Sequence, residues 1–359
     1  MRQFHPLKIQ SITRETDDAV SIIFDVPQDL KDIYHYEQGQ HVVLKAQVNG
    51  EELRRNYSIC ASKHDDTLRV AVKRIPEGRF SSFANEVLKS GDMIEVFPPA
   101  GHFYSDLDAT QERHYVAFAG GSGITPVLSN IKTVLEEEPK SYFTLCYGNR
   151  NVPAIIFLEE LAALKNRFMG RLEIFHFLED EEDEISLFNG RLDKAKIQEL
   201  LEHLIPTPDV HAFFICGPGP MMDAAEDALK AAQVPTDKIY IERFVTAGAP
   251  APKLDATRVK EHEDAATKAK VSLVLNGSRR SFAYDPKHGS ILDAARAASH
   301  DVPFACKGGV CCTCRAKLVD GDVDMAVNYG LRDDEVEAGY VLTCQSVPVS
   351  DAVTLDYDA

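Results

Sequence analysis

The stretch Cys306-Lys307-Gly308-Gly309-Val310-Cys311-Cys312-Thr313-Cys314 is the most informative part of this sequence. Cys306, Cys311 and Cys314 have the spacing C-x4-C-x2-C, and a further cysteine, Cys344, follows downstream. The two glycines let the backbone fold close to whatever the thiolates bind, because glycine has no side chain and accepts positive φ. The spacing therefore predicts four thiolates that converge on one metal group.

Three kinds of site can be weighed for these cysteines. The spacing is typical of a plant-type [2Fe-2S] cluster. A structural zinc site usually has two separated ligand pairs, often with histidine, and a disulfide pair is the remaining alternative. The additional cysteine, Cys312, is expected to be a small buried side chain. The favoured interpretation is a [2Fe-2S] cluster held by Cys306, Cys311, Cys314 and Cys344.

The residues around these cysteines resemble the ferredoxin family. The resemblance is carried by Phe304-Ala305-Cys306 through Cys314 and by Tyr340-Val341-Leu342-Thr343-Cys344-Gln345. It implies a small α+β ferredoxin-like (β-grasp) domain, expected over residues 271–359, that carries one electron at a time. The remaining chain should then contain what supplies those electrons.

Composition limits the possible partners and location. The chain has 359 residues, with 44% hydrophobic and 26% charged residues, so two or three globular domains are expected. The net charge of −17 argues against nucleic acid, although it permits docking on a basic protein surface. There is no apolar run of about 18 residues and no signal-peptide pattern. We expect a cytoplasmic protein without a membrane span, whose cysteines are metal or redox ligands.

Residues 1–108 contain short alternating runs that are separated by Gly and Pro. The runs at 20–26, 41–45 and 68–73 are expected to be strands, and one helix is expected near residues 81–89. Many short strands with a single helix predict a small antiparallel β-barrel.

Two motifs in this segment suggest a ligand site. Arg55-Asn56-Tyr57-Ser58 lies in an expected strand, where alternate residues share a face; an ordinary edge strand is the alternative. Gly78-Arg79-Phe80-Ser81-Ser82 precedes a helical pattern. Free N–H groups at a helix start favour phosphate, whereas the alternative is a simple N-cap serine.

The two motifs, in this order, resemble the flavin domain of the ferredoxin–NADP reductase superfamily. The resemblance implies that Arg55 contacts a flavin phosphate, that Tyr57 packs on the isoalloxazine, and that Ser58 hydrogen-bonds near its N5. Asn56 belongs to the same motif. The residues that the resemblance assigns to the pyrophosphate are Gly78, Ser81 and Ser82. FAD is the expected flavin, with FMN as the alternative.

Residues 109–245 repeat the pattern strand, loop, helix. The apolar run 115–119 is followed by Gly120-Gly121-Ser122-Gly123-Ile124-Thr125-Pro126 and then a helical pattern. This arrangement predicts an α/β doubly wound domain with a phosphate-binding turn. The turn resembles the nicotinamide-domain turn of the same superfamily. The resemblance implies nucleotide contacts from Gly121, Gly123, Thr125 and Pro126.

The choice between the two nicotinamide nucleotides depends on arginines. The expected strand 142–147 leads to Gly148-Asn149-Arg150. A loop arginine after a strand can meet the adenosine ribose or its 2′-phosphate. With Arg171 or Arg191 nearby, Arg150 would favour NADPH over NADH; ordinary solvated arginines are the alternative.

Two later stretches are also similar to the superfamily. Cys216-Gly217-Pro218 resembles its turn beside the nicotinamide, although Cys216 could equally be a buried core thiol. In 239–244, the resemblance implies that Phe244 covers the flavin face and that Glu242 lies close to the hydride path; core packing is the alternative for Phe244. The catalytic candidates are therefore Ser58, Cys216, Glu242 and Phe244.

Residues 246–270 are rich in Ala, Pro, Lys and Glu and are interpreted as a linker. Beyond it, the runs 271–275 and 281–284 flank Asn276-Gly277, which predicts a β-hairpin. Ser290 is a plausible N-cap for a following helix. The cluster loop comes directly after that helix.

The order of the domains predicts the reaction. A nicotinamide gives two electrons as a hydride, a flavin takes both and releases them singly, and the cluster carries single electrons. We therefore expect an NAD(P)H-dependent reductase whose acceptor is another protein. The sensor alternative, a non-enzymatic protein with the same domains, is disfavoured by the intact nucleotide turn.

The whole chain is similar to the reductase subunits of bacterial phenylacetyl-CoA epoxidases (ring 1,2-monooxygenases). Besides the domain order, the resemblance is carried by Asn189-Gly190-Arg191-Leu192-Asp193 and by Glu337-Ala338-Gly339 before the last cysteine motif. It implies a di-iron oxygenase as the electron acceptor and a role in phenylacetate catabolism. The alternatives are a reductase for another oxygenase or hydroxylase, aromatic or steroid, or for a desaturase.

Overall fold

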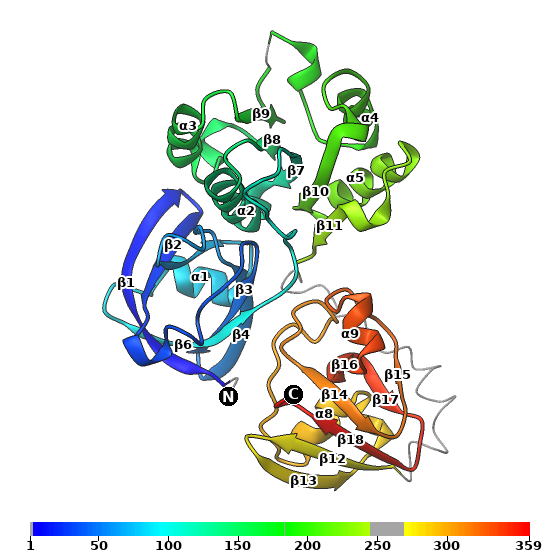
Figure 1. The fold of residues 1–359 in the computed structure, drawn as a ribbon. Helices are drawn as coiled ribbons and strands as arrows, with labels where there is room; N and C mark the ends of the chain where they lie inside the picture. Colours follow the sequence, from blue (N-terminus) through cyan, green and yellow to red (C-terminus); the bar gives the residue numbers. More distant parts are fainter. Residues whose placement is uncertain (1–2, 183, 245–268) are drawn as a thin grey trace.

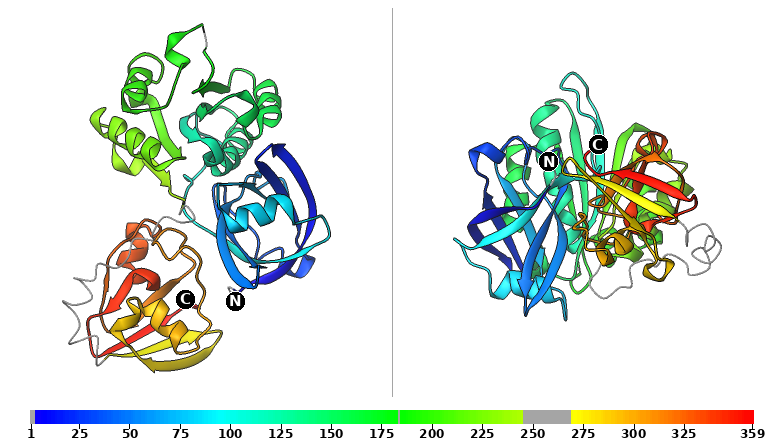
Figure 2. Two further views of the ribbon diagram at one scale, coloured as in Figure 1. Left: turned by 180° about the vertical axis from the view of Figure 1, so that it is seen from behind. Right: turned by 90° about the horizontal axis from the view of Figure 1, so that it is seen from below.

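The computed structural model describes residues 3–182, 184–244 and 269–359. They form an antiparallel barrel, a parallel sheet with helices, and a smaller mixed sheet, in this order along the chain (Figure 1). The views in Figure 2 show the barrel and the C-terminal unit side by side, with the parallel sheet across from both. The predicted fold class, a barrel followed by a doubly wound and a β-grasp unit, is confirmed. Among the helices of the described residues, none is long and apolar enough to cross a membrane.

The barrel is an antiparallel sheet in the strand order β4-β3-β6-β1-β2-β5. A bridge between Ile59 and Val70 joins the end of β4 to β5 and so closes the sheet. Its interior is filled by alternate apolar residues of the strands. The elements are β1 (His5–Thr16), β2 (Ala19–Asp25), β3 (His41–Val48), β4 (Glu51–Ser58), β5 (Leu68–Lys73), α1 (Arg79–Glu86) and β6 (Met93–Ala100).

The second unit is a five-stranded parallel sheet in the order β11-β10-β7-β8-β9. One face packs against α2 and α3 and the other against α4 and α5, which explains why its central strands are apolar throughout. The elements are β7 (His114–Gly120), α2 (Ile124–Glu137), β8 (Tyr142–Asn149), α3 (Leu158–Arg167), β9 (Leu172–Leu178), α4 (Lys194–His203), β10 (Val210–Cys216), α5 (Gly219–Ala231) and β11 (Ile239–Glu242).

The third unit is a mixed sheet in the order β13-β12-β18-β14-β16 with a separate β15–β17 pair. The predicted hairpin and the Ser290 cap are confirmed: Asn276 and Gly277 both have positive φ, and Ser290 accepts a hydrogen bond from Asp293 N. The elements are β12 (Lys270–Leu275), β13 (Ser278–Ala283), α8 (Ile291–Ala297), β14 (Arg315–Asp320), β15 (Val323–Met325), α9 (Asp333–Glu337), β16 (Tyr340–Leu342), β17 (Ser346–Pro348) and β18 (Ala352–Asp356).

The predicted linker lies almost entirely outside the described residues. Of residues 246–270, only Ala269 and Lys270 are described, and Lys270 already belongs to β12.

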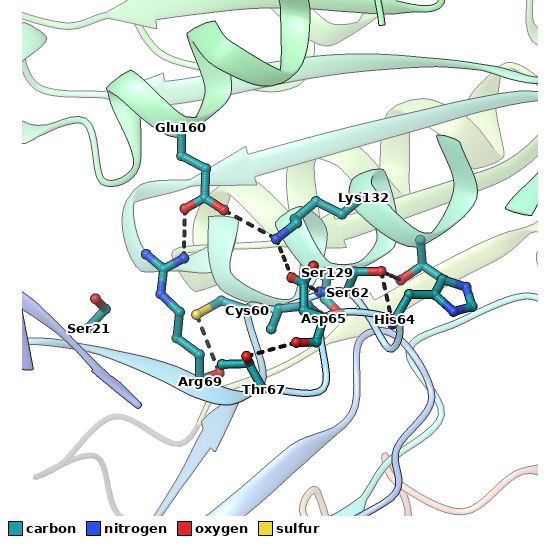
Figure 3. A network of polar contacts seen from close by, with 12 residues as sticks. Ser21, Cys60, Ser62, His64, Asp65, Thr67, Arg69, Ser129, Lys132 and Glu160 are labelled. Atoms are coloured by element: carbon teal, nitrogen blue, oxygen red, sulfur yellow. Dashed lines mark hydrogen bonds and ion pairs between the residues drawn. The ribbon is translucent and has the colours of Figure 1, made fainter. Parts of the chain in front are cut away.

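A polar network joins the barrel to the parallel sheet (Figure 3). Arg69 on β5 donates to Glu160 on α3 at 2.7 Å and to Glu15 on β1 at 3.0 Å, and its guanidinium stacks on the Phe157 ring at 4.6 Å. Lys132 on α2 also contacts Glu160. Because these charges are mostly shielded from water, the network fixes the barrel relative to the sheet.

We expect Arg69→Ala to destabilise the junction between the two units. The change leaves Glu15 and Glu160 without their shared cation, and an arginine side chain that is only 16% exposed contributes more than a surface pair. The loss should be about 1–3 kcal/mol, seen as a lower midpoint for the first transition in urea. Arg167→Ala is the matched control, since its pair with Glu136 is 61% exposed on the arginine side and should contribute at most about 1 kcal/mol.

Candidate functional site

A cavity lies between the barrel and the nucleotide turn of the parallel sheet. It is lined from three directions: by strands β4 and β5, by the start of α1, and by residues that follow β7 and β11. The lining residues are Arg55, Asn56, Tyr57, Ser58, Ala71, Lys73, Ile75, Gly78, Phe80, Ser81, Ser122, Thr125 and Phe244. The structure thus brings together most of the residues predicted to bind flavin, and adds Thr125 and Phe244 from the neighbouring unit.

The Ser58 hydroxyl is the clearest polar feature of this cavity. Ser58 is 2% exposed, and its Oγ has no hydrogen-bond partner among the described residues. A buried hydroxyl without a partner is costly, so a ligand that hydrogen-bonds there would satisfy it. Tyr57 offers an apolar surface beside it and packs against Phe80, with the ring centroids 5.7 Å apart. An aromatic ring system with polar edge atoms, as a flavin has, fits these surroundings.

The start of α1 supplies the phosphate-binding part of the cavity. Gly78 is the N-cap residue, and no side chain caps the helix. The N-cap serine considered as an alternative is therefore not observed. Ser81 Oγ instead accepts a hydrogen bond from Ile75 N and donates one to the Gly78 carbonyl. If residue 78 had a Cβ, this atom would lie only 2.3 Å from Ser81 Oγ. Glycine is required for this tight turn, which leaves backbone N–H groups free for an anion.

A second groove lies at the carboxyl ends of the parallel strands, where β7 adjoins both β8 and β10. The strand order reverses there, and such a switch point is where doubly wound sheets bind nucleotides. Its lining includes Gly120, Gly121, Gly148, Asn149, Arg150, Glu179, Gly190, Arg191, Pro218 and Met221. Lys73, at the end of β5, lines both the groove and the flavin cavity. Sequence reasoning did not single out Lys73, because a terminal lysine on a strand is usually a solvated charge.

The floor of this groove is formed by two turns in close contact. A Cβ at Gly123 would lie 2.0 Å from the Cys216 carbonyl oxygen, and one at Gly217 would lie 2.9 Å from Gly120 N. Gly121 has a φ of +51° and its carbonyl accepts from Tyr147 Oη. Glycines at 123 and 217 therefore let the turns after β7 and β10 touch. Pro126 is buried in the first turn of α2 behind them.

Of the three arginines considered for NADPH, the groove contains two. Arg150 and Arg191 line it, and Arg191 is paired with Glu179 at 2.8 Å. Arg171 does not line the groove: its guanidinium donates to the carbonyls of Leu135, Glu138 and Ser141 and so closes the end of α2. Arg171 is held there by the free carbonyl groups at the end of α2. The sequence alone does not reveal which side chain will bind such carbonyls.

The other three catalytic candidates, Phe244, Cys216 and Glu242, lie in different surroundings. Phe244 lines the flavin cavity and is half-buried. The Cys216 thiol is completely buried, and burial, with the charge of Glu242, raises its pKa well above the usual range. Glu242 lies with its carboxylate 3.4 Å from His41 Nδ1. Ser82 does not line the flavin cavity but lines a neighbouring one with Arg150.

The cluster loop has the tight conformation that its glycines predict. Gly309 has a φ of +75° and a Cβ there would lie 2.9 Å from the Val327 carbonyl oxygen. The amides of Gly308 and Cys311 donate to Cys306 Sγ at 3.3 and 3.4 Å. Thiolates that receive such N–H groups are typical of iron–sulfur sites, where these bonds tune the potential.

In sequence, β14, β15, α9 and β16 separate Cys344 from the other three predicted ligand cysteines. Cys311, Cys314 and Cys344 are at most 5% exposed. A hydrogen bond with Cys314, burial, and the charges of Cys314, Cys306 and Cys311 all raise the pKa of the Cys344 thiol. Cys312 is also buried, and its Sγ lies 3.9 Å from the Val310 carbonyl oxygen.

These three sites define a class of protein: a flavin-dependent oxidoreductase with a nicotinamide nucleotide site and an iron–sulfur site. The chain matches three families, "Oxidoreductase FAD-binding domain" over residues 6–104, "Oxidoreductase NAD-binding domain" over 118–227, and "2Fe-2S iron-sulfur cluster binding domain" over 273–349. Its cofactors are FAD, NAD(P)H and a [2Fe-2S] cluster.

Similar proteins of known function indicate which kind of oxidoreductase this is. The chain is 44% identical to a subunit of the 1,2-phenylacetyl-CoA epoxidase of Escherichia coli (strain K12), covering 100% of this chain and 99% of that protein. It is 31% identical to the ferredoxin reductase component of 3-ketosteroid-9-alpha-monooxygenase from Rhodococcus rhodochrous, covering 98% and 96%. The solved structure of phthalate dioxygenase reductase matches with 28% identity and a TM-score of 0.59, covering 98% of both chains. The protein belongs to the family of oxygenase reductase components with FAD, NAD and [2Fe-2S] domains.

Proposed function

We propose that this protein takes electrons from NADPH and passes them, through FAD and a [2Fe-2S] cluster, to a di-iron oxygenase that epoxidises the ring of phenylacetyl-CoA. The observation that carries the choice of acceptor is the 44% identity to the E. coli epoxidase subunit along the whole chain. In the proposal the cysteines of the cluster loop are thiolate ligands of the cluster and not disulfides, which suits a cytoplasmic setting.

We assign the flavin site as follows. Arg55 and the start of α1, with Gly78 and Ser81, hold the phosphates, and Ser82 would reach them from the neighbouring cavity that it lines. Tyr57 packs on the ring system and Ser58 hydrogen-bonds to its edge. The unpartnered Ser58 Oγ and the uncapped helix support this assignment. Asn56 lies in the same wall of the cavity. The proposed domain limits are 1–108 for flavin, 109–245 for the nucleotide and 271–359 for the cluster.

The chain's own residues position the reactants. When bound, FAD would supply the chemistry that accepts two electrons together as a hydride and releases them singly, which a one-electron cluster requires. The proposed nucleotide contacts are Gly121, Gly123, Thr125, Pro126, Gly217 and Pro218, beside the buried Cys216. In this proposal Phe244, which lines the flavin cavity, shields the flavin from water until the nicotinamide displaces it. The four proposed ligands, Cys306, Cys311, Cys314 and Cys344, form the electron exit.

The acceptor can be tested by reconstitution. The purified protein should support NADPH-dependent consumption of phenylacetyl-CoA by the oxygenase subunits of a phenylacetyl-CoA epoxidase, and it should also reduce cytochrome c without them. Turnover with a 3-ketosteroid monooxygenase oxygenase but not with the epoxidase would overturn the choice of acceptor. Absence of cytochrome c reduction by either nucleotide would contradict the reductase activity itself.

The NADPH preference is tested at Arg150. We expect Arg150→Ala to raise the KM for NADPH about tenfold while the KM for NADH changes little, because a charge-assisted contact to the 2′-phosphate is lost. The exposed Arg167→Ala is the matched control and should leave both values unchanged. Equal effects on the two nucleotides would exclude a 2′-phosphate role for Arg150.

A further inference from the structure

His41, the first residue of β3, lies where all three units meet. Its side chain is 1% exposed, and its Nε2 lies 3.1 Å from the Cys311 carbonyl oxygen, 270 positions away in the sequence. A carbonyl oxygen only accepts, so Nε2 carries the proton and donates to it. The barrel therefore holds the cluster loop by a buried hydrogen bond to the backbone of a proposed cluster ligand.

The same histidine is adjacent to the flavin cavity. His41 pairs with Ser58 in the β3–β4 register, and directly opposite residues of an antiparallel pair project from the same face with Cβ atoms about 4.5–5.5 Å apart. Ser58 lines the flavin cavity, and His41 contacts the cluster loop. This pair thus places one residue beside each of the two proposed cofactor positions.

The parallel sheet contributes the third contact. The Glu242 carboxylate at the end of β11 lies 3.4 Å from His41 Nδ1, at ion-pair distance but without good hydrogen-bond alignment. Gly101 after β6 also packs against the ring, since a Cβ there would lie 3.0 Å from Nδ1. The imidazole is therefore confined by the barrel backbone and by Glu242 while it faces Cys311.

We propose that His41 is a positioning residue for electron transfer from the flavin to the cluster. By donating Nε2–H to the Cys311 carbonyl, it fixes the cluster loop against the Ser58 side of the flavin cavity. The step that it serves moves one electron from reduced FAD to the oxidised cluster and neither makes nor breaks a bond. The inference rests on the proposed flavin and cluster assignments at Ser58 and Cys311.

Other contacts also join the barrel to the C-terminal unit. The Arg54 guanidinium stacks on Phe304 at 4.1 Å, and His102 Nε2 lies 2.8 Å from the Glu335 carboxylate. These contacts hold the units together in the absence of the His41 bond. Loss of His41 should therefore alter the loop position without separating the units, which makes its effect measurable.

The test follows the cluster and the flavin separately in the full-length holoprotein. We compare wild type, His41→Phe, which fills the site but cannot donate, and His41→Gln, which supplies an amide donor. After mixing with NADPH in a stopped-flow instrument, flavin reduction should be unchanged in both variants. Cluster reduction should slow about five- to tenfold in His41→Phe, as expected for the loss of one hydrogen bond, and His41→Gln should restore most of the rate.

A second readout does not depend on electron transfer. Hydrogen–deuterium exchange of the peptide over 306–314 should be faster in His41→Phe than in wild type and close to wild type in His41→Gln. Should His41→Phe fail to fold, His41→Met is the substitute that also lacks a donor. His114→Gln is the matched control, since His114 is likewise buried and bonded, to Thr144, but lies inside the parallel sheet. It should leave cluster reduction unchanged.

The possible results distinguish the proposed role of His41 from the flavin and cluster assignments on which it rests. A wild-type protein that lacks FAD or cluster absorption would contradict the assignments. If wild type holds both cofactors but His41→Phe reduces its cluster at the wild-type rate, or if His41→Gln is as slow as His41→Phe, the positioning role is overturned. Slowing in His41→Phe with rescue in His41→Gln, and the matching exchange pattern, would support it.

Discussion

Replacing any one of Cys306, Cys311, Cys314 or Cys344 with serine is expected to abolish the visible absorption of the cluster. A serine hydroxyl is not a thiolate, and each of these residues is a proposed iron ligand. NADPH should still reduce the flavin at close to the wild-type rate, because every described residue that lines the flavin cavity belongs to the barrel or to the parallel-sheet unit. Cytochrome c reduction should fall at least tenfold if the cluster is the electron exit.

Cys312→Ser is the matched control for these variants. Cys312 lies in the same loop and is equally buried, with its Sγ toward the Val310 carbonyl. We expect the cluster spectrum to be retained, with at most a small loss of stability. Loss of the chromophore in Cys312→Ser would make Cys312 a ligand, and loss of flavin reduction in the four ligand variants would contradict the modular scheme. The measurements are iron content and visible spectra of the anaerobically purified proteins.

The second large effect is expected for Gly123→Ala. The new Cβ would lie 2.0 Å from the Cys216 carbonyl oxygen and 2.7 Å from Gly217 N, and both atoms belong to backbone that cannot move without shifting β10. The overlap should cost about 1–3 kcal/mol or more and should distort the floor of the nucleotide groove. Both stability and nucleotide affinity should therefore fall, with KM for NADPH raised at least tenfold.

Gly219→Ala is the matched control in the same unit. No atom would lie within 4 Å of a Cβ at residue 219, and its φ is not positive, so the melting temperature should stay close to the wild-type value. Thermal unfolding and NADPH titration of flavin reduction check both variants. If Gly123→Ala melts like wild type and binds NADPH normally, the turns after β7 and β10 are not in the close contact that the structure shows.

Backbone shapes that depend on a short stretch of sequence could be predicted. The spacing of the cysteines, the glycine turn after β7 and the Asn276-Gly277 hairpin each specify a backbone shape on their own, and the structure shows a turn at each place. The roles of individual site residues remain predictions. Arg171 was placed with the nucleotide arginines because its charge is visible in the sequence, whereas the α2 carbonyls that it binds are not.

The contacts between units could not be predicted in the same way. His41 is one histidine at the start of a strand, and nothing near it in the sequence indicates Cys311 or Glu242 as neighbours. Such contacts depend on how separately folded units dock, and that information is spread over whole surfaces. The place of Lys73 could not be predicted for the same reason. Lys73 lines both cavities only because the barrel packs against the parallel sheet.

The position of β18 has a consequence for how the protein is made. This strand lies in the middle of the third sheet, between β12 and β14, although it is the last of them along the chain. All four proposed ligand cysteines have left the ribosome before residues 352–356 do, so the nascent loop cannot yet rest on a finished sheet. The third sheet can therefore close only after residues 352–356 have been synthesised, and β12 and β14 have no strand between them until then.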